Sequence, residues 1–355
     1  MSDHTEQLCA TVAAAYADQR PLRIGAGNSK TFLGEAGDPG EVLDMTTHSG
    51  IVNYRPQELT ITARAGTPLA KLQSVLAEQG QMLAFDPPHY GATATLGGTI
   101  AAGLSGPARP YVGAARDFVL GCRIINGRGQ ALRFGGEVMK NVAGYDLSRL
   151  MAGAYGTLGV LLDVSLKVLP LPRAQVTLIH ETDAATAIRQ FNAWAGKPHP
   201  ISAAYWDNGR SYLRLSGADA AISSARQTLG GELLDNDTQL WRGIREQERD
   251  FFQGELPLWR LSIAPATPPL AIDSVSDDQC AIGWGGAQRW LVTTADAEAV
   301  RRAAANVGGH AQLYRGTATP RMHPLPTPLM TLHRNLKLSL DPAGVLNRGR
   351  LYPDL

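Results

Sequence analysis

The sequence predicts an α+β protein of two domains, and three observations support this class. With 355 residues, the chain is longer than one hydrophobic core usually serves. A proline-rich stretch over 169–173, LPLPR, separates two halves of different order, so we place the domain boundary there. In the second half, strands and helices alternate with hairpin signals between them, which is typical of a mixed domain with an antiparallel sheet.

The first half begins with a helix over 6–18, because apolar residues recur there at helical spacing. Thr67 and Pro68 predict the start of a second helix, with Thr67 as the N-cap and Pro68 at the first helical position, and Gly80 ends it. The remaining expected elements are strands over 21–30 (running into a glycine turn), 42–46, 50–54, 59–66, 118–125, 131–134 and 160–169, and a short helix at the end of 140–150.

The second half shows one pattern of elements twice, although the residues themselves do not repeat. We expect strands over 176–180, 201–206, 212–215, 259–263, 281–284, 289–293 and 311–314. The expected helices cover 184–194, 218–229, 295–307 and 325–340.

Composition excludes several classes of protein. The 33 basic and 32 acidic side chains leave a net charge of +1, so nothing favours nucleic acid or an acidic membrane surface as a partner. Three distant cysteines form neither a disulfide framework nor the four-ligand set of an iron–sulfur cluster. The eight histidines are scattered, so we expect no metal site. No apolar run is long enough to span a membrane, and the polar N-terminus lacks a secretion signal, so we expect a cytoplasmic protein.

The most informative stretch is 87–110, PPHYGATATLGGTIAAGLSGPARP, which is rich in glycine and alanine and carries little charge. Glycine lets the backbone approach a large ligand closely, because no Cβ intervenes. We therefore interpret the stretch as a loop that cradles a cofactor. The alternative is a tightly packed helix in a hydrophobic core, which would require small residues at one spacing.

Two further glycine turns flank this stretch, over 25–29 (GAGNS) and 153–159 (GAYGTLG). The first follows a predicted strand, and backbone N–H groups in such a turn suit a pyrophosphate. It is neither a Walker loop nor a dinucleotide fingerprint, since Lys30 occupies the position where the latter requires glycine. A nicotinamide cofactor would use one glycine loop, whereas three such segments suit an extended ligand, so FAD fits better.

Several motifs, taken in order, resemble the vanillyl-alcohol-oxidase family of flavoproteins with a PCMH-type FAD-binding domain. Within this family, the resemblance is greatest to the FAD-binding E subunits of bacterial glycolate oxidases. It is dense over the first 170 residues and extends more thinly to the end of the chain. The motifs are PLRIGAGNSK, LTITARAGTPLAKL, DPPHYGATATLGGTIAAGLSG, GAARDFVLG, KNVAGYDLSRLMAGAYGTLGV, WRLSIAP, IGWGGAQRWL, HPLP and DPAGVLNRGRLY.

The resemblance implies a PCMH-type FAD-binding domain of two α/β subdomains over 1–170 and an α+β substrate or cap-type domain over 174–340. A tail over 341–355 would return to the first domain. The implied pyrophosphate site is the backbone of Gly25, Ala26, Gly27, Asn28 and Ser29. The implied wall along the flavin and ribityl chain is Pro87, Gly91, Ala92, Thr93, Gly97, Gly98, Ala101, Ala102, Ser105 and Gly106. Gly156, Gly159 and Val160 would face the adenine half, and Asn347 would return to the flavin edge.

The chain departs from the family pattern in three places. Covalently flavinylated members carry histidine in the first turn, where this chain has Asn28, so noncovalent FAD is expected. Tyr155 replaces an acidic residue that is common in relatives. The metal-binding H-x-G-D-G-N-x-H stretch of catalytic relatives does not occur.

Candidates for catalysis are correspondingly few. Oxidation of a hydroxy acid needs a base and a cation for the carboxylate, and His89 and Arg116 are candidates for these roles. Arg109 is a second candidate for the carboxylate, while Lys140 and Arg348 are candidates for stabilising a negatively charged reduced flavin.

The resemblance implies an FAD-dependent oxidoreductase subunit of a glycolate (2-hydroxyacid) oxidase complex, which passes electrons to an iron–sulfur subunit. Its partners would be a catalytic-type flavoprotein subunit and the iron–sulfur subunit, and the complex would place it at the periphery of the inner membrane. Two alternatives stay open: a self-sufficient hydroxyacid dehydrogenase, and a non-catalytic flavin-binding scaffold for a catalytic paralogue.

Overall fold

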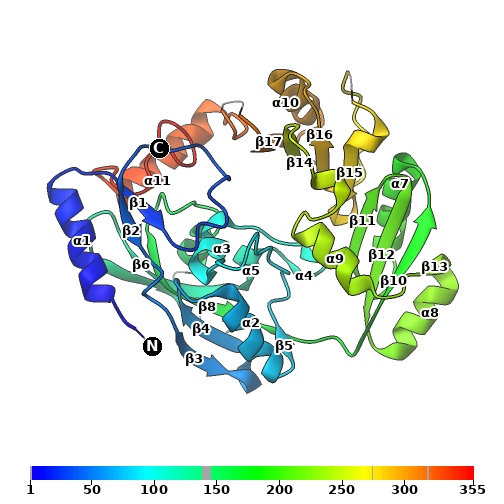
Figure 1. Cartoon of the computed structure of the whole chain (residues 1–355), viewed down its shortest axis with the longest axis horizontal. Coiled ribbons are helices and arrows are strands. Elements are labelled where there is room, and N and C mark those ends of the chain that lie inside the picture. The colour runs from blue at the N-terminus through cyan, green and yellow to red at the C-terminus, as the bar shows by residue number, and fades with distance from the viewer. Residues whose placement is uncertain (1, 138–144, 274, 318–319) are drawn as a thin grey trace. The chain divides into compact units, whose positions relative to one another are not determined.

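A computed structural model describes residues 2–137, 145–273, 275–317 and 320–355. Contacts between Cα atoms divide the chain into two compact units. The first unit comprises the residues up to Ser105, together with Gly113–Leu171 and Pro324–Leu355. The second unit comprises Gly106–Val112 and Pro172–His323. Figure 1 shows the elements of both units.

The chain passes between the units within the predicted linker 169–173, but two segments group differently from the expected domains. Gly106–Val112, at the end of the glycine-rich stretch, groups with the second unit. The last helix, α11 (Thr327–Leu340), groups with the first unit, whereas the sequence pattern placed it in the second domain. Only the short tail after 340 was expected to rejoin the first domain.

The first unit contains two main sheets. The parallel pair β1–β2 leads into the first glycine turn, and the other sheet has the order β3-β4-β8-β6-β7 with every neighbouring pair antiparallel. A minor antiparallel pair joins β5 and β9. The strands are β1 (Leu22–Gly25), β2 (Glu41–Asp44), β3 (Ile51–Arg55), β4 (Thr60–Arg64), β5 (Gln81–Met82), β6 (Val119–Ile125), β7 (Ala131–Gly135), β8 (Val160–Lys167) and β9 (Leu169–Pro170).

Helices cover these sheets. Their bounds are α1 (Thr5–Ala17), α2 (Leu69–Glu78), α3 (Leu96–Ala102), α5 (Ala115–Phe118), α6 (Tyr145–Leu150) and α11. The predicted cap of α2 is wrong, because Pro68 occupies the N-cap and Thr67 makes no capping bond. The Thr67 hydroxyl instead accepts from the backbone N–H of Gly50 at 2.9 Å, and so fixes the start of β3.

The central stretch is not a loop throughout, because α3 lies within it. Thr95 caps this helix by accepting from the N–H of Gly98 at 3.2 Å, and Gly103 ends it in the left-handed conformation with φ of 63°. The helical alternative is therefore correct for 96–102. A Cβ on Gly97 would lie 2.6 Å from the Cβ of Ala65, so glycine is required where α3 passes the end of β4.

The second unit is built on an eight-stranded antiparallel sheet of order β13-β10-β12-β11-β15-β16-β14-β17. The predicted recurrence is confirmed, since each half follows the chain order strand, connection, strand, strand, helix, strand and the halves meet at β11 and β15. The strands are β10 (Ala174–Glu181), β11 (Ile201–Asp207), β12 (Arg210–Gly217), β13 (Glu232–Leu233), β14 (Leu258–Ser262), β15 (Cys280–Gly283), β16 (Gln288–Val292) and β17 (His310–Arg315). The helices are α4 (Arg109–Val112), α7 (Ala184–Ala195), α8 (Asp219–Leu229), α9 (Asp237–Arg245) and α10 (Ala297–Ala305).

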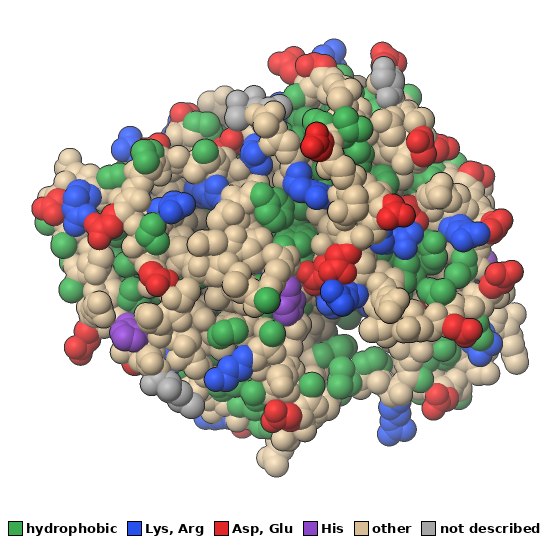
Figure 2. Space-filling view, viewed as in Figure 1, with side chains coloured by type: hydrophobic (Ala, Val, Ile, Leu, Met, Phe, Trp, Pro, Cys, Tyr) green, Lys and Arg blue, Asp and Glu red, His purple; other side chains and the backbone are tan. Residues whose placement is uncertain are grey.

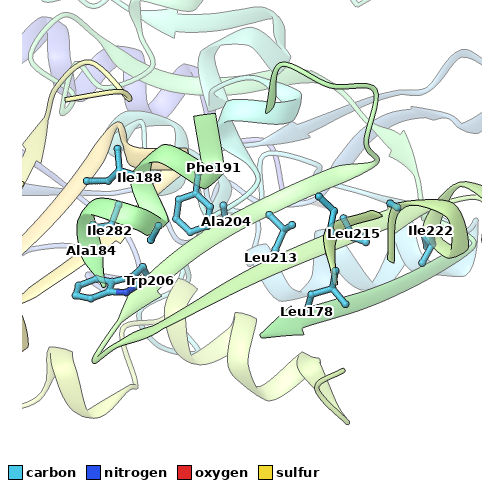
Figure 3. Packing of buried hydrophobic residues seen from close by; sticks show 13 residues of the cluster. Leu178, Ala184, Ile188, Phe191, Ala204, Trp206, Leu213, Leu215, Ile222 and Ile282 are labelled. Atoms are coloured by element: carbon cyan, nitrogen blue, oxygen red, sulfur yellow. The ribbon is translucent and has the colours of Figure 1, made fainter. Parts of the chain in front are cut away.

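Two apolar cores stabilise the second unit, one in each half. Figure 3 shows the first, in which Trp206 and Phe191 pack among aliphatic side chains of α7, α8 and the sheet. Trp259 and Leu261 of β14 form the second core with α10. Burying side chains of this size contributes roughly 1.5–3 kcal/mol each.

Acidic and basic side chains are interspersed on the visible face of the molecule, as the near-equal counts of 32 and 33 lead one to expect (Figure 2). Among the helices of the described residues, none is both long enough and apolar enough to cross a bilayer.

Candidate flavin site

A groove in the first unit is lined by residues from all three glycine-rich segments. Strand β1, the first glycine turn, α3, the third glycine turn and the C-terminal tail contribute to its walls. The lining residues are Ile24, Gly25, Ala26, Asn28, Ser29, Lys30, Thr31, Met45, Ala65, Gly97, Gly98, Ala101, Ala102, Met151, Ala154, Tyr155, Gly156, Gly159, Leu161, Asn347 and Arg350.

The first and second segments touch through Gly27 and Thr93. A Cβ on Gly27 would lie 1.5 Å from the carbonyl oxygen of Thr93, so only glycine permits this approach. The Thr93 hydroxyl donates to the carbonyl oxygen of Gly27. Neither residue lines the groove. Their contact holds the first turn against the residues that lead into α3.

The second and third segments are joined by backbone hydrogen bonds. The N–H of Gly153 donates to Ile100 at 3.0 Å, and the N–H of Tyr155 donates to Ala101 at 2.9 Å. A Cβ on Gly103 would lie 2.8 Å from the Cα of Gly153, so the two backbones are in close contact there. The third turn is thus fixed to the C-terminal end of α3.

The tail closes the groove through Asn347. Its side-chain oxygen accepts from the N–H of Ile24 at 2.7 Å, and its side-chain nitrogen donates to the carbonyl oxygen of Tyr155 at 2.6 Å. One amide therefore connects β1, just before the first turn, with the third turn. This places Asn347 between two walls of the groove.

The charges along the groove suit an anion. Lys30 and Arg350 contribute two cations, and none of the described lining residues is Asp or Glu. The Lys30 ammonium donates to the carbonyl oxygen of His89 at 2.9 Å and to the Ser29 hydroxyl at 3.2 Å. The Arg350 guanidinium donates to the carbonyl oxygens of Thr31 and Glu35. These bonds hold both cations beside the first turn.

The uncharged walls suit a planar group. Ala101, Ala102, Ala154 and Leu161 present small or flat apolar surfaces, and a Cβ on Gly98 would meet only the Thr95 hydroxyl, at 3.2 Å. Two cations beside a mostly apolar lining match a ligand with a pyrophosphate and an aromatic ring system. The residues present therefore fit FAD.

Most of the residues implied by the resemblance line this groove, and the others have different surroundings. Val160 is fully buried at the start of β8, and Gly91, Ala92 and Thr93 are exposed. The Ser105 hydroxyl accepts from the N–H of Ala115 at 2.9 Å. Gly27, Pro87, Gly91, Ala92, Thr93, Ser105, Gly106 and Val160 are not among the groove's lining residues.

Gly106 belongs to the second unit. Its carbonyl oxygen accepts from the indole N–H of Trp284 at 3.0 Å. The Arg109 guanidinium lies 4.2 Å from the centre of the Trp284 ring in the same unit. The segment Gly106–Val112 is thereby anchored to the loop between β15 and β16.

The candidates for catalysis also lie outside the groove lining. The His89 ring bonds Gln73 of α2 at 2.8 Å. The side chain of Arg116 is 62% exposed and lies near Asp117, and Arg348 pairs with Asp38 at 3.3 Å. Lys140 lies outside the described residues.

Sequence reasoning missed several lining residues. Lys30 directly follows the first glycine turn, Tyr155 lies in the third, and Arg350 lies within the tail motif, but none of the three was predicted to line a cofactor site. Ala65, Met45, Met151 and Leu161 come from strand ends and helix ends, where nothing in the sequence marks which face they present. Lys30, a cation directly after a glycine turn, was a usable signal in the sequence.

The three cysteines are free thiols in separate places. Cys122 is buried in β6, Cys9 lies in α1 and Cys280 begins β15 of the second unit. Across the part of the chain that the structure describes, no group of three or more His, Cys, Asp and Glu side chains could hold a metal ion.

Comparison with known proteins identifies the chain's relatives. A profile of the FAD binding domain matches residues 2–135. The glycolate oxidase subunit GlcE of Escherichia coli is 48% identical over 354 residues, covering 99% of both chains. The glycolate oxidase subunit GlcD of Bacillus subtilis is 33% identical over 141 residues, or 39% of this chain and 30% of that protein.

Solved structures agree on the fold. The structure of an alkyldihydroxyacetonephosphate synthase superposes with a TM-score of 0.67 and 14% identity, covering 97% of this chain and 75% of that one. The fold and the groove define an FAD-binding flavoprotein of the PCMH type, an oxidoreductase subunit. More particularly, the chain belongs to the family of the GlcE subunit of glycolate oxidase. The predicted fold class, family and cofactor are confirmed.

Proposed function

We propose that this chain is the FAD-bearing subunit of a glycolate (2-hydroxyacid) oxidase complex, in which glycolate is oxidised to glyoxylate. The similarity to GlcE along 99% of both chains supports the assignment to such a complex. The observation that carries the flavin role is the convergence of three glycine segments on one groove with two cations and no acidic residue in its described lining.

Within the groove, we assign the pyrophosphate to Gly25, Ala26, Asn28 and Ser29, with Lys30 supplying positive charge. Backbone N–H groups and an ammonium are the groups that phosphate oxygens prefer. Gly97, Gly98, Ala101 and Ala102 would border the flavin and ribityl chain, with Gly156 and Gly159 toward the adenine half. Asn347 would orient the turns instead of meeting the flavin edge, because its amide bonds to Ile24 and Tyr155.

We further propose noncovalent binding. Asn28 occupies the turn where covalent members carry histidine, and the described lining contains neither His nor Cys. Bound FAD would supply the chemistry of accepting a hydride or electron pair. The chain's own residues would neutralise the phosphates and exclude water from the apolar walls.

Electrons would leave through a separate iron–sulfur subunit. The whole chain has three cysteines, fewer than the four thiolates that a cluster usually requires, and they lie in separate elements. A GlcD-type flavoprotein would be the second partner, and the complex would locate this chain peripherally at the inner membrane.

A direct experiment tests the proposal. The purified chain should show a flavin absorption band that trichloroacetic acid releases into the supernatant. Anaerobic glycolate should bleach this band when the GlcD-type and iron–sulfur subunits are present. Bleaching in the isolated chain would instead support a self-sufficient dehydrogenase. A flavin band that never responds, even in the assembled complex, would support the scaffold and refute electron transfer through this subunit.

A further inference from the structure

The helix α11 has an inverted burial pattern. Its one buried residue is Lys337, which is 6% exposed, whereas Leu329, Leu332 and Leu338 are 41%, 54% and 58% exposed. Lysine is almost never fully buried unless it is paired. A buried ammonium inside a helix that exposes three of its five leucines therefore requires a specific reason.

The Lys337 ammonium has three acceptors, one for each of its N–H groups. It donates to the Asp341 carboxylate at 2.7 Å, to the carbonyl oxygen of Leu346 at 2.7 Å and to the carbonyl oxygen of Thr157 at 2.8 Å. Leu346 belongs to the tail and Thr157 to the third glycine turn. One ammonium thus connects α11, the tail and a wall of the groove.

Asp341 folds the tail back toward β1. Its two carboxylate oxygens accept from the N–H groups of Val345 at 3.0 Å and of Leu346 at 2.8 Å. The folded tail then pairs with β1, since the N–H of Leu22 donates to Val345 at 2.7 Å and the N–H of Asn347 donates to Leu22 at 3.0 Å. Asp341 is completely buried, so these bonds form without competing water.

The two side chains Asn347 and Lys337 hold alternate carbonyl groups of the third turn, those of Tyr155 and Thr157. Gly156 lies between them, has φ of 73° and lines the groove. In a planar trans peptide, the C=O and the N–H point in opposite directions. Holding the Tyr155 carbonyl toward Asn347 therefore turns the N–H of Gly156 to the opposite side.

We propose that the buried Lys337–Asp341 pair is a positioning element of the flavin site, which acts through Asn347 and Thr157 to set the third glycine turn for the coenzyme. This inference rests on the proposed assignment of the groove to FAD. Neither Lys337 nor Asp341 lines the groove, so any effect on FAD affinity would pass through the residues that they hold. Residues that orient the ligands of a metal site commonly matter about 10–100-fold in affinity, and we expect an effect of similar size here.

The test compares FAD affinities of apoproteins by quenching of flavin fluorescence, well below each protein's unfolding temperature. Lys337→Met and Asp341→Asn should each raise the Kd at least about tenfold, and the visible spectrum of the remaining bound flavin should shift. Lys337→Gln retains a hydrogen-bond donor and should give a smaller increase. It keeps the inference testable if Lys337→Met fails to fold.

The matched control is Arg249→Met, which breaks the Arg249–Asp207 pair of the second unit, where both N···O distances are 2.8 Å. It should lower the unfolding temperature but leave the Kd for FAD unchanged. If folded Lys337 variants lose stability yet keep the wild-type Kd and flavin spectrum, the pair is only structural and the inference is refuted. If the wild-type chain itself binds no FAD, the assignment of the groove fails instead.

Discussion

The ammonium of Lys30 lies 2.9 Å from the carbonyl oxygen of His89, and this bond holds a cation of the first glycine turn against the central stretch. The Lys30 ammonium also lies 5.9 Å from the centre of the Tyr90 ring. Both contacts restrict its position at the groove. The Lys30 side chain lines the groove, where an ammonium attracts an anionic ligand.

Lys30→Met should therefore weaken FAD binding. Loss of a charge-assisted bond to phosphate is worth about 1.5–3 kcal/mol, which corresponds to roughly a tenfold to hundredfold increase in Kd. Titration of the apoprotein with FAD at low and high salt measures the Kd. The Kd of Lys30→Met should also depend less on salt than the Kd of wild type. Lys71→Met, on the exposed face of α2, is the control. Equal affinities for Lys30→Met and wild type would remove Lys30 from the site.

Asn28→Asp should also weaken binding, by at least about tenfold, because a carboxylate would face the phosphates. Asn28 has φ of 54°, a conformation that Asp tolerates, so the fold should be retained. The Kd for FAD and the far-ultraviolet circular dichroism together check this. An unchanged Kd would mean that the phosphates lie elsewhere.

Gly98→Val should abolish flavin content while leaving the second unit folded. The branched side chain would enter the groove and would also crowd the Thr95 hydroxyl, 3.2 Å from the position of a Cβ. The ratio of flavin absorbance to protein absorbance gives the content. Gly196→Val is a matched control, since a Cβ there meets its nearest atom only at 3.7 Å. Full flavin content in Gly98→Val would contradict the placement of the ring system along α3.

Thr95→Ala should destabilise α3 by about 1 kcal/mol, because the cap of the helix is lost. Chemical denaturation measures this loss, and the Kd for FAD should rise with it because α3 forms a wall of the groove. Thr95→Ser keeps the hydroxyl and should behave nearly as wild type. Equal stability of the alanine and serine variants would show that the cap contributes nothing.

Alkaline pH should destabilise the protein through its buried thiol, Cys122. Burial raises the pKa of Cys122 from 9.0 to about 12. The unfolded thiol ionises first, so this contribution to stability is complete below pH 9 and is lost as the pH rises toward 12. For one group, the free energy of unfolding changes by at most about 1.4 kcal/mol per pH unit. Chemical denaturation of wild type and Cys122→Ala at pH 8 to 11 gives the free energy of unfolding of each protein as a function of pH. Identical pH dependences would show that Cys122 does not have a raised pKa in the folded protein.

Most strands of both units could be predicted because apolar periodicity and turn residues are local properties of the sequence. The hairpin at Asn126–Gly129 and the recurrence in the second half are examples. The two-residue strands β5, β9 and β13 were not expected. Helix α9 could not be predicted, because its segment, DTQLWRGIR, is polar and contains Gly243. Of its nine residues, only Trp241, Gly243 and Ile244 are buried. Helix α3 was not favoured, because Gly97 and Gly98 disfavour a helix by themselves. In the structure, Gly97 lets this helix pack closely against Ala65.

The groove could be predicted only in part. Glycine turns are visible in the sequence, so its three main walls were expected. The contribution of α11 was not expected, because a buried lysine holds this helix against the first unit. The periodicity of a sequence does not predict that a charged residue is buried. Spacing of Lys337 and Asp341 by four residues suggests an ordinary surface pair, and only the fold shows that both are buried.

The return of Pro324–Leu355 to the first unit has a consequence for biosynthesis. A ribosome makes the other walls of the groove first, then all of Pro172–His323, and only afterwards the segment that carries Asn347. The nascent chain therefore lacks the Asn347 link between β1 and the third turn until this segment has been synthesised. On the proposed assignment of the groove, we expect a product truncated before Pro324 to carry less flavin than the chain of 355 residues.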